Sequence, residues 1–123
     1  MKKTEMLKKN YEFKYILNKG KYYSGENIEA FIKKNNNSKN YLGIAISSKA
    51  GKAIQRNRLK RLIRENYSLI ESNIKPGYSI IFLIKKQKNI KNIYYSDIKS
   101  DVKKIVVRAK MLQGNEKNID YRR

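Results

Sequence analysis

GKAIQRNRLKRLIRENY, residues 51–67, mixes five cationic side chains between positions 56 and 64 with regularly spaced leucine and isoleucine. On a helix of about 3.6 residues per turn, Leu59, Leu62 and Ile63 fall on one side, and most of the cations fall on the opposite side. The stretch therefore predicts a helix over about residues 54–72. One face of this helix would be buried in a core, and the other would present a row of positive charge.

This row of charge has too few acidic neighbours to be an ordinary salt-bridged surface. Glu65 is the only acidic residue in the stretch, and Arg56, Lys60 and Arg64 repel one another at four-residue spacing. Arginine makes up only seven of the 30 cations in the chain, yet four arginines lie here. The planar guanidinium group suits bidentate phosphate contacts. The pattern favours a polyanionic partner.

The composition of the whole chain supports the same partner. Lys and Arg outnumber Asp and Glu by 30 to 10 within 123 residues, which leaves a net charge of +20. The repulsion among these charges weakens the folded state unless a polyanion neutralises them. A nucleic acid is therefore the favoured partner, and a membrane surface is the alternative. The length is typical of one domain. Cysteine and histidine are absent, which excludes disulfides, thiolate metal sites and histidine general bases.

No segment looks like a targeting or membrane sequence. The basic N-terminus is not followed by the apolar stretch of a signal peptide. The longest apolar run, Ile80–Ile84, is far too short to cross a bilayer. We therefore expect a cytoplasmic protein without a membrane partner.

Hydrophobic periodicity predicts an α+β fold with the element order αβββαβα. The expected helices cover residues 11–18, 54–72 and 96–112, and the expected strands cover 21–24, 27–34, 41–47 and 78–84. They form a single domain, residues 1–114, with one mainly four-stranded sheet. We expect the helices to pack on one face and the other face to stay open for RNA. Residues 115–123 are expected to form a flexible polar tail.

The segment AISSKAGKAIQRNRLKRLIRE resembles the signature of the bacterial ribonuclease P protein subunit, whose RNR motif lies on the second helix. LKKNYEFKYILNKG, YLGIAISSK and KPGYSIIFLIKK are similar to other segments of that family, in the same order. The resemblance covers about 110 residues, and the motif with its flanking elements is far more specific than a basic helix alone.

The resemblance implies a function without a protein active site. Proteins of this family bind a catalytic RNA, and the complex removes the 5′ leader from precursor tRNA. The chain would thus be the non-catalytic subunit of an endoribonuclease. Its partners would be the catalytic RNA and the leader of precursor tRNA, with no small-molecule substrate. Mg²⁺ would be the cofactor, held mainly by RNA oxygens, with no metal site in the protein alone.

The resemblance also implies which residues contact the catalytic RNA. On the motif helix and in the loop before it they are Arg56, Asn57, Arg58, Lys60, Arg61, Arg64, Lys49 and Lys52. Ser48 stands where the family commonly has a second lysine, which puts one phosphate contact in doubt.

In the family, aromatic side chains line a cleft for the leader on the open face of the sheet. Phe13, Leu17 and Phe31 match these positions, although Leu17 replaces a common aromatic. Strand alternation places Phe31 with Glu29 and Lys33, on the face opposite the apolar side chains, where a base can stack on its ring. For Phe13, packing in the core is the alternative.

A structural RNA-binding protein of the ribosomal type, without a role in catalysis, is the alternative function. An RRM does not fit, because its βαββαβ order differs from the order predicted here. A membrane-active basic protein is the weakest alternative, because the apolar faces are needed for a core.

Overall fold

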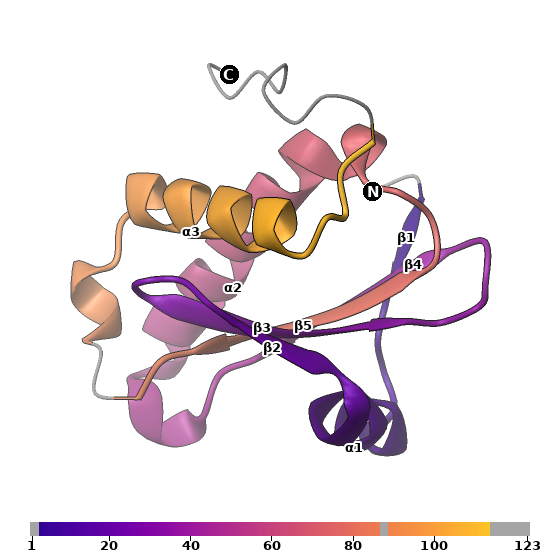
Figure 1. Cartoon of the computed structure of the whole chain (residues 1–123). Helices are drawn as coiled ribbons and strands as arrows, with labels where there is room; N and C mark the ends of the chain where they lie inside the picture. The colour runs from indigo at the N-terminus through magenta and orange to yellow at the C-terminus, as the bar shows by residue number, and fades with distance from the viewer. Residues whose placement is uncertain (1–2, 87–88, 114–123) are drawn as a thin grey trace.

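The computed structural model describes residues 3–86 and 89–113, which form one five-stranded sheet and three α-helices (Figure 1). The strands are β1 (Thr4–Met6), β2 (Lys21–Ser24), β3 (Ile28–Lys34), β4 (Asn40–Ala45) and β5 (Tyr78–Ile84). The helices are α1 (Asn10–Lys19), α2 (Ala53–Ile70) and α3 (Tyr95–Arg108). Short 3-10 turns are η1 (Ser48–Ala50), η2 (Glu71–Asn73) and η3 (Ile90–Asn92).

The predicted α+β class and the order of the seven predicted elements are confirmed. The structure adds β1, so the sheet has five strands instead of the four expected. The three residues of β1 carry no alternation long enough to predict a strand, and they pair only at the edge of the sheet, with β4.

The sheet has the strand order β1-β4-β5-β3-β2. The strands β1, β4 and β5 are parallel to one another, whereas β3 is antiparallel to both β5 and β2. Because β4 and β5 are parallel neighbours, the chain must cross over between them, and α2 makes this crossover. The carboxyl ends of β4 and β5 therefore lie together, next to the loop that enters α2.

The main core lies between the sheet and the helices α2 and α3. Leu59, Leu62, Ile63 and Ile70 of α2 are all buried, as the helical periodicity predicts. They pack in one cluster with side chains such as Ile80 and Phe82 of the sheet and the buried side of α3. The predicted amphipathic helix is confirmed.

The expectation that all helices cover one face of the sheet is wrong for α1. Figure 1 shows α1 on one side of the sheet and α2 and α3 on the other. Ile16 of α1 packs with Leu7 and Ile81 in a separate, smaller cluster. Ile81 provides the reason, because β5 is apolar on both faces and needs cover on both. The face opposite α2 is thus only partly open.

None of the helices in residues 3–86 and 89–113 is long and apolar enough to cross a membrane. The predicted tail, residues 115–123, lies outside the described residues.

Candidate nucleic-acid interface

The solvent side of α2 carries the cations that its sequence predicts there. Asn57, Arg61 and Arg64 are exposed, and Lys60 is half-buried. A hollow of about 490 Å³ runs along this side, lined by Ile54, Gln55, Asn57, Arg58, Arg61 and Arg64. Arg61 Nε lies 3.7 Å from Glu65 Oε1, and both side chains are more than half exposed. Such a pair is weak, so the guanidinium group remains available to phosphate. We call this side of α2 the motif surface.

Two arginines of the motif donate hydrogen bonds to backbone carbonyl groups of the protein. Arg56 Nη1 donates hydrogen bonds to the carbonyl oxygens of Gly51 at 2.5 Å and Ser48 at 3.4 Å. Arg58 Nη2 donates to the carbonyl oxygen of Ile93 at 2.7 Å. Arg56 thereby fixes the loop before α2, and Arg58 fixes the segment that leads into α3. Both act as positioning groups for the rest of the surface.

The loop between β4 and α2 holds the two other predicted cations, Lys49 and Lys52, which are both exposed. Gly51 allows this loop to pack closely, because an added Cβ would meet Ile90 Cδ1 at 2.7 Å and Gln55 Oε1 at 2.9 Å. The Gln55 side chain in turn accepts a hydrogen bond from the backbone N–H of Lys52 at 3.2 Å. The loop therefore has a defined position beside the motif surface.

The three predicted cleft residues share the α1 side of the sheet. Phe13, Leu17 and Phe31 are each half-buried against the small cluster around Ile81. Phe13 lies directly on β4, since an added Cβ at Gly43 would meet its ring at 2.8 Å. Close contact with the sheet favours a packing role for Phe13, and Leu17 packs in the same cluster.

Of the three predicted cleft residues, Phe31 is the one that lies beside a second, exposed aromatic ring. Its ring centroid lies 5.3 Å from that of Tyr22, which is 48% exposed. The Tyr22 hydroxyl donates a 2.6 Å hydrogen bond to Glu29, and this bond raises the pKa of Tyr22. The pair of rings forms an accessible aromatic step on the open part of the sheet. Two more tyrosines lie on the sheet: Tyr41 packs with the small cluster around Ile81, and Tyr23 packs against the main core.

The structure also brings together cations that sequence reasoning missed. A hollow of about 490 Å³ lies where β5 ends beside the loop before α2, lined by Ser47, Lys49, Ala50, Ile84, Lys85, Lys86 and Asn89. Lys85 and Lys86 directly follow a buried strand, and this position in the sequence could have indicated a binding site at the strand end. In open sheets with parallel strands, ligands bind beyond the carboxyl ends of the strands. We call this site the strand-end hollow.

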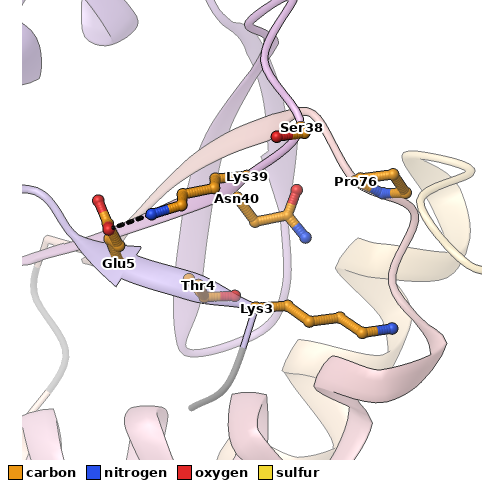
Figure 2. Close-up of a pocket in the computed structure, with 7 residues that line it drawn as sticks. All are labelled: Lys3, Thr4, Glu5, Ser38, Lys39, Asn40 and Pro76. Carbon is orange, nitrogen blue, oxygen red and sulfur yellow. Dashed lines mark hydrogen bonds and ion pairs between the residues drawn. The ribbon is translucent and has the colours of Figure 1, made fainter.

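A further hollow, of about 340 Å³, lies between β1, the start of β4 and Pro76 (Figure 2). Here Lys39 Nζ lies 2.7 Å from Glu5 Oε1. Their hydrogen bond lowers the pKa of Glu5 and raises that of Lys39. Glu5 neutralises one of the two lysines that line this hollow, Lys39, and leaves Lys3, so the hollow carries less positive charge than the motif surface.

Residues 3–86 and 89–113 contain no group of three His, Cys, Asp or Glu side chains that could hold a metal ion.

A family model described as Ribonuclease P matches residues 1–110 of the chain. The chain belongs to this family. The ribonuclease P protein component of Clostridium botulinum (strain Langeland) is 37% identical over 108 residues, with 87% of this chain and 96% of the relative covered. That of Clostridioides difficile (strain 630) is 38% identical over 108 residues, with 87% and 93% covered.

Solved ribonuclease P proteins have the same fold. The protein from Staphylococcus aureus superposes with a TM-score of 0.77 at 28% identity, over 88% of this chain and 97% of that one. The protein from Thermotoga maritima gives a TM-score of 0.75 at 26% identity, over 85% and 96% of the two chains. The ribonuclease P family predicted from the RNR motif is thus confirmed.

Proposed function

We propose that this chain is the protein component of ribonuclease P and that it acts by positioning two RNAs. The motif surface would bind the catalytic RNA, and the open part of the sheet would bind the 5′ leader of precursor tRNA. The observation that carries the proposal is the separation of these surfaces, with cations on the outer side of α2 and aromatic rings on the α1 side of the sheet. One protein can therefore contact both RNAs at once.

The strand-end hollow connects the two surfaces. Lys49 comes from the loop that enters α2, whereas Lys85 and Lys86 follow β5. Leu83, two residues before Lys85, pairs with Glu29 on β3, next to the aromatic step. We propose that this hollow binds phosphates of the RNA that passes from one surface to the other. Lysine contributes a point charge there, so the contact would neutralise phosphate without reading bases.

The chemistry of cleavage is assigned to the RNA, and the cofactor Mg²⁺ to phosphate oxygens of the RNA. Mg²⁺ prefers oxygen ligands and commonly binds substrate phosphates. The contribution of the protein is electrostatic, because its cations reduce the repulsion between two polyanions that must lie close together. Precursor tRNA is made in the cytoplasm, and we propose that the protein works there.

The test is reconstitution with the catalytic RNA of the same organism, scored by 5′ cleavage of a precursor tRNA. Arg61→Ala combined with Arg64→Ala should lower cleavage by roughly tenfold or more at low Mg²⁺, because two charge-assisted contacts are lost. The loss should shrink at high Mg²⁺, where free cations screen the RNA. Lys103→Ala with Lys104→Ala, on α3, removes the same charge and serves as the control.

Equal cleavage by wild type and the double arginine variant at every Mg²⁺ concentration would contradict the proposal. So would an equal loss in the α3 control, because it would indicate that total charge matters and that the motif surface does not. A protein that copurifies with ribosomal RNA and does not stimulate cleavage would instead be a structural RNA-binding protein.

A further inference from the structure

A hollow of about 550 Å³ lies between α2 and the first turn of α3, beside the motif surface. Its lining residues are Arg61, Arg64, Glu65, Ser68, Leu69 and Tyr95. We propose that this hollow binds one unpaired nucleotide of the catalytic RNA, with its base against Tyr95 and its phosphate on Arg64. The inference rests on the proposed function and adds a site that reads a single nucleotide to a surface that otherwise contacts the RNA backbone.

The apolar part of the hollow is available to a ligand. Tyr95 is 37% exposed. Leu69 is half-buried, and it lies outside both hydrophobic clusters formed by the described residues. An aromatic ring beside an aliphatic side chain offers a flat apolar site, and any nucleobase has a face that can stack on it. The core of the protein does not use these two side chains, so a ligand can.

The position of Tyr95 is set by contacts around it. Arg58 Nη2 holds the carbonyl oxygen of Ile93 at 2.7 Å, which fixes the segment before α3 to α2. Ile93 itself is buried. Asp97 Oδ2 then accepts a hydrogen bond from the backbone N–H of Tyr94 at 2.8 Å and fixes the first turn of α3. The backbone that carries Tyr95 is thus held by these contacts, so only the side chain has to be ordered when a base binds.

The polar part of the hollow matches the rest of a nucleotide. Within residues 3–86 and 89–113, the one ion pair of Arg61 is the exposed 3.7 Å contact with Glu65, so its guanidinium group can turn towards a phosphate at little cost. Arg64 is exposed beside it. Glu65 offers a carboxylate and Ser68 a hydroxyl, which can bond to the polar edge of a base. Stacking face, anion partners and edge partners therefore meet in one hollow.

The experiment compares Tyr95→Ala with Tyr95→Phe in complexes with the catalytic RNA. Affinity is measured over a series of salt concentrations, and unpaired bases are probed chemically. Tyr95→Ala should weaken binding by about fivefold to a hundredfold, the range that one stacked base corresponds to. Tyr95→Phe should bind within about twofold of wild type because it keeps the ring. One base protected by wild type and Tyr95→Phe should become reactive with Tyr95→Ala.

Salt dependence separates stacking from charge. Tyr95→Ala should keep the wild-type slope of log affinity against log salt, whereas Arg64→Ala should reduce this slope by about one. Tyr11→Ala removes an exposed tyrosine on α1, across the sheet, and should change neither quantity. If Tyr95→Ala proves unstable to urea, Leu69→Ser tests the same hollow from α2 with the same expected loss of affinity.

Wild-type affinity in both Tyr95→Ala and Leu69→Ser would overturn the inference, and so would an equal loss in Tyr95→Ala and Tyr95→Phe. If Arg64→Ala still weakens binding in that case, only the nucleotide site fails and the proposed function stands. An identical pattern of base protection in wild type and Tyr95→Ala would also overturn the assignment.

Discussion

Tyr67 of α2 is fully buried, and its hydroxyl shares a 2.8 Å hydrogen bond with Thr4 Oγ1 of β1. Burial raises the pKa of Tyr67 to about 12, from the ordinary value of 10.0. The native state therefore keeps this proton at a pH where the unfolded chain loses it. The stability that the buried phenol contributes is complete below about pH 10 and is lost as the pH rises through about 12.

Tyr67→Phe should reveal this titration as a change in relative stability. At about pH 8 the wild type should be more stable by about 1 kcal/mol, because the variant leaves Thr4 Oγ1 without its partner. Between about pH 10 and 12 the difference should shift by about 2–3 kcal/mol in favour of the variant, which has no proton to lose. Urea unfolding of both proteins across this range provides the measurement. A difference independent of pH would contradict the assignment.

The positions of some site residues could be predicted from the sequence, and those of others could not. The alternation in β3 correctly placed Phe31 on the face away from the main core. Phe13 lies directly on Gly43, which is thirty positions away in the sequence. No local sequence pattern predicts such a contact. Lys85 and Lys86 reach the site for a similar reason, because only the pairing of β4 with β5 brings their strand end beside the loop of Lys49.

Among the elements, α2 could be predicted to within two residues because its stripe of leucine and isoleucine, from Leu59 to Ile70, repeats over about three turns. The side of the sheet that α1 covers could not be predicted. Its periodicity indicates which stripe is buried, whereas the choice of face depends on where Leu7 and Ile81 offer apolar surface. The strand β1 was missed because its three residues are too few to show a strand alternation.

The link between α3 and the β2–β3 turn is another contact without a local signal. Asp101 is 1% exposed, and its carboxylate accepts hydrogen bonds from the backbone N–H groups of Glu26 at 3.0 Å, Asn27 at 2.7 Å and Ile28 at 3.1 Å. One buried carboxylate thus satisfies the donors of an entire turn. The β2–β3 turn then positions the start of β3, the strand that carries Phe31.

Replacing Asp101 by Ala should destabilise the protein by about 3 kcal/mol, because three backbone donors lose their acceptor. Asp97→Ala on the same helix is the matched control. It removes one half-buried carboxylate that caps a single N–H, and should cost about 1 kcal/mol. Urea unfolding compares the two variants. Equal losses in both would show that the buried network does not stabilise the turn.

For the whole molecule, the net charge of +20 and the arrangement of the elements lead to the same interpretation. The core separates two surfaces, with α2 and α3 on one side of the sheet and the aromatic step on the other. Charge alone predicted a polyanionic partner, and the RNR motif identified the family. The separation of the surfaces required the tertiary structure, because it depends on which face each helix covers.

Directed cleavage of the RNA from a single tethered position tests the central claim most directly. The chain contains no cysteine, so Ile54→Cys on the motif surface and Lys104→Cys on α3 each provide one attachment point for a hydroxyl-radical source. Ile54 is 77% exposed, so the change should not disturb the core. In the reconstituted complex, we predict strong cuts in the catalytic RNA from position 54 and few from position 104. Strong cuts from position 104 and none from position 54 would contradict the account.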